Sequence, residues 1–140
     1  MNEKIPYEWF RRAKKESDPY FKFMSIYVAL NFLYNADMSG NERKRMCRYL
    51  CNEVGEHSYQ WKIASNSEFI KSPVVDMKDS NPYPVKEGDF ESLFSAIYTV
   101  RCNLFHGNKS LGDLRDKALV QEAADVLIDV LSYRLGNLNV

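Results

Sequence analysis

The residues of this 140-residue chain best suited to chemistry are an arginine and a histidine five positions apart, Arg101 and His106. An arginine stays charged at any physiological pH and can hold two phosphate oxygens at once. A histidine titrates near neutrality, so it can take up or release a proton during a reaction. Such a pair can bind a phosphodiester and move a proton, which are two of the tasks of phosphodiester cleavage.

Arg101 interrupts the apolar stripe of a helix that the sequence predicts to start after Asp89 and to run to about residue 105 or 106. Asp89 suits the N-cap of this helix, and Gly107-Asn108 suits its end because both residues tolerate a positive φ. Apolar residues recur along it at helical spacing: Phe90, Leu93, Phe94, Ile97 and Leu104. Arg101 occupies a position where this pattern predicts a leucine.

The spacing of Arg101 and His106 constrains how they can meet. On a regular helix they lie roughly 140° apart, because each residue turns the helix by about 100°. Either the helix unwinds near Gly107, or the two side chains converge from two copies of the chain.

Other roles are open for the same residues. Arg101 could pair with a buried carboxylate, for which the candidates by type are Glu91, Asp116 and Asp125. His106 could cap the helix, whose C-terminal end favours a positive charge. Cys102 and His106 have the spacing of a nucleophile and its base, but nothing in the sequence supplies an orienting acid or an oxyanion hole. No metal or other cofactor is expected, because the spacing of the remaining candidate ligands matches no common zinc pattern: Cys47, Cys51, His57 and Cys102.

The length of the chain favours one domain over residues 1–140, and its helical patterns make that domain all-α. Hydrophobic residues make up 45% of the chain and charged residues 27%, which is ordinary for a globular protein. A formal net charge of zero argues against strong non-specific binding of nucleic acid by the monomer. No apolar run reaches the roughly 18–20 residues that cross a bilayer, so no membrane partner is expected. Three cysteines without a signal peptide predict a cytoplasmic protein.

Helical patterns elsewhere predict a four- or five-helix bundle. They cover residues 7–16, 19–36 and 42–54, a weaker segment over 58–71, and a last helix capped by Ser110 or Asp113. Ser17 or Asp18 can cap the second of these helices and Pro19 suits its first turn, and Gly55 is expected to end the third. Residues 72–88 form an irregular connector with three prolines, in which Val74-Val75 could be extended. The helix over 19–36 is apolar nearly all round, so it should be central in the bundle or shared with a second copy. The basic residues Arg43, Lys44, Arg45 and Arg48 are interpreted as a solvated helix face.

The string Val100-Arg101-Cys102-Asn103-Leu104-Phe105-His106-Gly107-Asn108-Lys109 resembles the signature of the HEPN superfamily, Arg-x4–6-His near the end of a late core helix. The similarity continues into the last helix with Arg115-Asp116, Leu119-Val120 and Ala123, and upstream into the apolar segment 27–34. It covers about residues 18–36 and 89–131.

This resemblance implies a four- or five-helix bundle that pairs as a homodimer. Many members are metal-independent endoribonucleases, often toxins of toxin–antitoxin or other defence systems; others are non-catalytic modules that bind RNA, a nucleotide or a partner protein. It implies that Arg101 and His106 are catalytic, and we expect Asn103, Cys102 and Lys109 to contact the RNA. An antitoxin such as a small nucleotidyltransferase is a possible partner. Cys102 departs from the pattern, because active members commonly have Asn, Asp or His directly after the arginine.

The chemistry of RNA cleavage sets a further requirement. Attack by the 2′-hydroxyl needs a base for its proton, a cation for the phosphorane charge and an acid for the leaving 5′-oxygen. One histidine cannot be base and acid in a single event, so two copies of the motif across a dimer cleft would complete the site. The alternatives are a non-catalytic binding module and a purely structural helical bundle.

Overall fold

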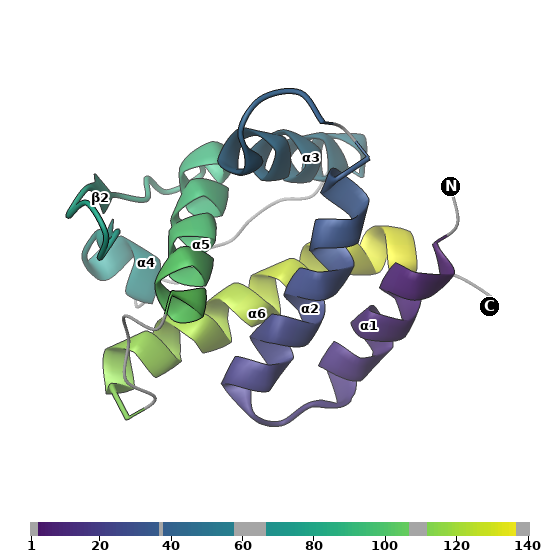
Figure 1. The fold of residues 1–140 in the computed structure, drawn as a ribbon, viewed down its shortest axis with the longest axis horizontal. Helices are drawn as coiled ribbons and strands as arrows, with labels where there is room; N and C mark the ends of the chain where they lie inside the picture. Colours follow the sequence, from purple (N-terminus) through teal and green to yellow (C-terminus); the bar gives the residue numbers. More distant parts are fainter. Residues whose placement is uncertain (1–2, 37, 58–66, 107–111, 137–140) are drawn as a thin grey trace.

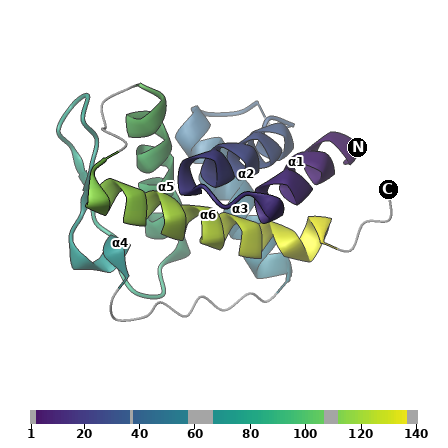
Figure 2. The same cartoon turned by 90° about the horizontal axis from the view of Figure 1, so that it is seen from below.

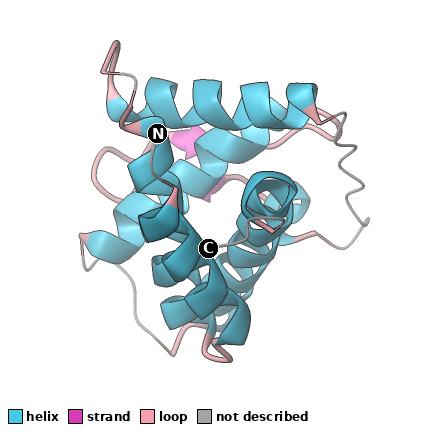
Figure 3. Cartoon of the chain, turned by 90° about the vertical axis from the view of Figure 1, so that its right-hand side faces the viewer, coloured by secondary structure: helices cyan, strands magenta, loops and turns pink. Residues whose placement is uncertain are grey.

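The computed structural model describes residues 3–36, 38–57, 67–106 and 112–136, and within them the chain forms six helices and one two-stranded sheet (Figure 1). The elements follow in the order α1 (Lys4–Lys15), α2 (Pro19–Tyr34), α3 (Glu42–Glu56), α4 (Glu68–Lys71), β1 (Val74–Val75), β2 (Pro82–Tyr83), α5 (Phe90–Phe105) and α6 (Leu114–Leu135). The predicted all-α bundle is confirmed. Five of the six helices are long, and α4 is a single turn of four residues. Figure 3 shows how little of the chain is strand.

Helix α6 is the element around which the bundle is built. It packs against each of the other five helices, and Figure 2 shows it running lengthwise along one side of the molecule. Helices α1 and α2 form a hairpin that lies along α6, α5 ends beside the N-terminal part of α6, and α3 lies beside its C-terminal part (Figures 1 and 2). The core between them is apolar, with Phe10, Phe23, Leu50, Phe94 and Leu127 each at most 1% exposed.

Short-range signals in the sequence set most helix starts. The Asp18 carboxylate accepts hydrogen bonds from the amides of Tyr20 and Phe21, and Pro19 follows in the first turn, as predicted. Asp89 and Asp113 cap α5 and α6 in the same way. The predicted stop at Gly55 is wrong, because α3 continues through it to Glu56. Most of the weaker segment over 58–71 lies outside the described residues, apart from α4, and so does Ser110.

Helix α2 is central, but one side of it is not covered. Phe21, Met24, Val28 and Phe32 are exposed there, beside Ile5 and Trp9 of α1, and we call these six residues the α1–α2 apolar face. Two grooves run over this face, one along Trp9, Met24 and Val28 and the other along Ile5, Val28 and Phe32. Among the described helices, none has the length and apolarity to cross a membrane.

The connector over residues 72–88 contains the small sheet. Val74 and Val75 of β1 pair antiparallel with Tyr83 and Pro82 of β2, so the predicted extended piece is confirmed. The hairpin packs on α5, which is the helix that carries Arg101.

Candidate functional site

The site at the end of α5 depends on how regular that helix is. It is α-helical through Phe105, and the amide of His106 still donates to the carbonyl of Cys102 at 3.0 Å. No unwinding therefore occurs between Arg101 and His106, and the separation of roughly 140° around the axis holds. The two side chains lie on different faces of one chain. Within one chain, α5 alone does not bring the two side chains together.

Arg101 lies in a box of aromatic rings. Its guanidinium carbon is 5.4 Å from the ring centre of Tyr27, 5.7 Å from that of Tyr98 and 5.2 Å from that of Phe105. The rings attract the cation through their negative faces and shield its aliphatic stem from water. This box explains why an arginine occupies a position of the apolar stripe, and it leaves the side chain 24% exposed.

The carboxylate nearest to Arg101 is Glu42, at the start of α3, with 3.7 Å between Glu42 Oε1 and Arg101 Nη1. The alternative role of Arg101, pairing with a partly buried carboxylate, is therefore present in the structure, but the carboxylate is Glu42 and not one of the candidates Glu91, Asp116 and Asp125. Glu42 is already well bonded: the Tyr98 hydroxyl donates to its Oε1 at 2.8 Å and the Tyr34 hydroxyl to its Oε2 at 2.9 Å.

The hydrogen bonds and the ion pair around Glu42 keep both Glu42 and Arg101 charged. Burial alone would raise the pKa of Glu42, but the hydrogen bonds from Tyr98 and Tyr34, together with the charge of Arg101, lower it overall. Burial would lower the pKa of Arg101, but Tyr27, Cys102 and Glu42 outweigh it and raise that pKa. The site therefore presents a permanent cation beside a carboxylate that stays ionised.

Comparison with Arg134 of α6 shows how lightly Arg101 is bound. Arg134 reaches Glu3 at 2.6 Å and Glu53 at 2.8 Å, both at full hydrogen-bond contact. Arg101 has the longer Glu42 contact and a weak one to Cys102 Sγ at 3.9 Å, and its buried Nε has no hydrogen-bond partner among the described residues. Arg101 is thus less tightly paired than Arg134, which forms a structural ion pair.

The other predicted site residues differ in how exposed they are. Cys102 is half-buried against Arg101, Lys109 lies outside the described residues, and the His106 side chain is exposed at the C-cap of α5. Asn103 is only 3% exposed, and its amide donates to the Val75 carbonyl and accepts from the Met77 amide, both at 2.9 Å. The structure therefore uses Asn103 to fix the connector to α5, in place of the predicted substrate contact.

Replacing Asn103 with alanine is expected to destabilise the fold by about 1–3 kcal/mol, because two hydrogen bonds worth about 0.5–1.5 kcal/mol each disappear. Urea unfolding measures this loss. Asn103→Asp is the matched control, since a carboxylate can still accept from Met77 but cannot donate to Val75. If the Asn103→Ala variant is stable but does not cleave RNA, the prediction that Asn103 contacts the substrate would be supported instead.

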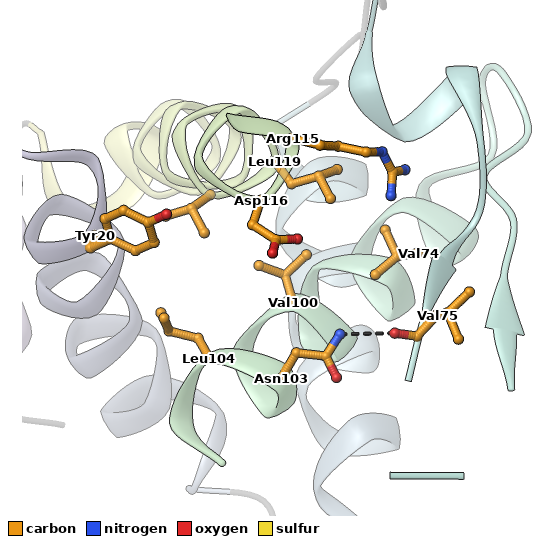
Figure 4. Close-up of a pocket in the computed structure, with 10 residues that line it drawn as sticks. Tyr20, Val74, Val75, Val100, Asn103, Leu104, Arg115, Asp116 and Leu119 are labelled. Atoms are coloured by element: carbon orange, nitrogen blue, oxygen red, sulfur yellow. Dashed lines mark hydrogen bonds between the residues drawn. The ribbon is translucent and has the colours of Figure 1, made fainter. Parts of the chain in front are cut away.

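Figure 4 shows the pocket on the Asn103 side of α5. Its walls come mainly from β1, α5 and α6, with Arg115 and Asp116 among the polar groups at its edge. The enclosed volume is about 30 Å³, which suits one or two water molecules. This pocket is too small for a nucleotide, so the candidate site remains the Arg101 box.

Sequence reasoning missed the residues that build this box. Tyr98 and Phe105 lie three before and four after Arg101, a spacing that places them on its face of the helix. Glu42 carried no such signal. Arg43, interpreted as solvated, is stacked between Tyr83 at 4.1 Å and Tyr98 at 4.7 Å and donates to the Ser95 carbonyl, so that interpretation is wrong for this residue.

Two further results bear on identity. Within the described ranges, no group of three or more His, Cys, Asp and Glu residues is arranged to hold a metal ion. The sequence matches no protein-family model, and neither a curated protein nor a solved structure shows significant similarity to the chain.

Proposed function

We propose that this protein is a metal-independent endoribonuclease of HEPN type, in which two copies of the chain bring their Arg101 and His106 side chains into one cleft. The proposal rests on the surroundings of Arg101. This side chain is charged, it is held by three rings, and it lies beside a carboxylate whose oxygens already accept hydrogen bonds from two tyrosines. The resemblance of residues 100–109 to the HEPN signature supports the same assignment.

In the proposed reaction, His106 of one copy takes the proton of the RNA 2′-hydroxyl, and the 2′-oxygen attacks the adjacent phosphorus. The P–O5′ bond breaks, and His106 of the second copy protonates the leaving 5′-oxygen. The products are a 2′,3′-cyclic phosphate and a 5′-hydroxyl. Arg101 donates to the phosphate oxygens as negative charge builds on them. These groups supply base, acid and charge without a metal ion.

The α1–α2 apolar face supports the dimer. A continuous apolar surface of this kind is unusual on a monomer and is typical of an interface. The face also leads to the site: Asn31 lines one of its grooves, and the same side chain donates to the Tyr34 hydroxyl at 2.8 Å, next to Glu42. A second copy covering this face would therefore lie beside the network that holds Arg101, with the same patch used on both copies.

Val28→Lys is expected to convert the dimer into a monomer, because it buries an unpaired charge in the centre of the interface. Sedimentation at micromolar concentration should show about twice the chain mass for the wild type and the chain mass for this variant. Met77→Lys is the control, since Met77 is also exposed but belongs to the connector. A wild type that sediments as a clean monomer would exclude the composite cleft.

The activity itself is tested with single-stranded RNA in the presence of EDTA. Cleavage should persist and leave 2′,3′-cyclic phosphate ends. DNA of the same sequence should resist because it lacks the attacking hydroxyl. Activity that EDTA abolishes would contradict the mechanism.

A second candidate is a non-catalytic module that binds RNA through the same arginine. Two observations favour it: Cys102 follows Arg101, and the Asn103 amide is used by the connector. Binding of RNA without any cleavage, lost in Arg101→Ala, would support this candidate.

A further inference from the structure

Phe105 is a large apolar side chain that the fold leaves 42% exposed, in the last turn of α5 between Arg101 and His106. The apolar residues two and three turns earlier on the same helix, Ile97 and Phe94, are fully buried. The exposed part of this ring is not used by the core, and it lies beside the candidate phosphate site.

The ring of Phe105 is held in position. It packs edge-on against Tyr27, with 6.1 Å between ring centres and 66° between planes. Tyr27 is itself buried and shares a hydrogen bond of 2.7 Å with the Tyr34 hydroxyl. Phe105 is thus a fixed aromatic surface, and ordering it on binding would cost little conformational entropy.

The ring is also within reach of whatever Arg101 binds, since the guanidinium carbon lies 5.2 Å from its centre. An aromatic ring next to a phosphate-binding cation is how many proteins hold single-stranded nucleic acid, with a base stacked on the ring and its phosphate on the cation. A base within a duplex is stacked on both faces and cannot reach such a ring without being flipped out.

We propose that Phe105 is the stacking platform for an unpaired nucleobase whose phosphate is bound by Arg101, so that the site selects single-stranded RNA. This inference rests on the proposed function. It adds a base subsite to the cleft and names the strand state of the substrate. Stacking is tolerant of base identity, so the platform gives a preference for unpaired RNA without a strong sequence preference.

The test compares Phe105→Leu, which keeps apolar volume, with Phe105→Tyr, which keeps the ring. The probe is a short single-stranded RNA with 2′-O-methyl groups, which cannot be cleaved, and a fluorescent 2-aminopurine base. Phe105→Leu should weaken binding of this probe about ten- to a hundred-fold and abolish the quenching of 2-aminopurine. Phe105→Tyr should retain both. With a cleavable RNA, Phe105→Leu should raise KM by a similar factor, whereas Phe105→Tyr should keep the KM of the wild type.

Several outcomes would overturn the platform. If the Phe105→Leu variant binds the RNA probe and quenches its 2-aminopurine as the wild type does, no base stacks on Phe105. If the Phe105→Leu variant sediments as a monomer and the wild type as a dimer, the ring belongs to the interface between the two chains. Double-stranded RNA that binds the wild type as tightly as the single strand excludes the preference. Failure of the wild type to bind any RNA overturns the proposed function as well, whereas the first three outcomes leave that function standing.

Discussion

His106→Ala is expected to lower the rate of RNA cleavage by about 10²–10⁴-fold, the usual effect of losing a general acid–base group. The fold should persist, because this side chain is exposed at the end of α5 and contributes nothing to the core. Single-turnover cleavage of a labelled RNA measures the rate, and thermal unfolding checks the fold.

The chain has one other histidine, His57, which provides a matched control. His57 stacks on Tyr133 with 5.5 Å between ring centres and lies 3.3 Å from the Glu53 carboxylate, so its environment is structural. His57→Ala should therefore leave the cleavage rate unchanged even if the melting temperature falls. Cleavage that survives in His106→Ala would point to a contaminating nuclease or to a different mechanism.

Arg101→Ala is expected to abolish detectable cleavage while lowering stability by about 2 kcal/mol, the scale of three cation–π contacts and a half-buried ion pair. The tyrosines that bond Glu42 remain in place, so the carboxylate is not left without partners. Arg134→Ala is the structural counterpart. It leaves Glu53, which is 4% exposed, without its close cation, and should cost roughly 3–5 kcal/mol.

Urea unfolding of the two alanine variants separates these roles. An Arg101→Ala variant as unstable as Arg134→Ala would mean that Arg101 is a structural residue. Arg101→Lys sharpens the comparison, because it keeps the charge and loses the planar fork. We expect it to bind RNA weakly and to cleave far more slowly than the wild type, since an ammonium cannot present the planar, bidentate fork of a guanidinium to two phosphate oxygens.

The parts of this fold that the sequence predicted are those set by neighbours along the chain. Asp18, Asp89 and Asp113 cap their helices through amides two or three residues away, so a short window suffices. The apolar stripe of α5 is equally local. Gly55 shows the limit of such signals: a glycine tolerates a helix end but does not require one, and α3 continues through it.

The parts that could not be predicted depend on contacts between helices. The tyrosine-bonded carboxylate beside Arg101 comes from α3, and no pattern in the sequence pairs Glu42 with a residue of α5. Asn103 had the right type and place for a substrate contact, but the connector folds back onto α5 and takes both ends of its amide. Lys109 belongs to the residues that the structure does not describe, so its role stays a prediction.

The central claim, that two copies of His106 act together in one cleft, is tested most directly by mixing subunits. Wild-type and His106→Ala chains are allowed to exchange at constant total concentration, and RNA cleavage is measured across the series of mixtures. If both histidines are needed, activity follows the square of the wild-type fraction, so an equal mixture keeps about a quarter of the wild-type rate. Activity proportional to the wild-type fraction, with about half remaining in an equal mixture, would show that each histidine works without its counterpart and would contradict the account.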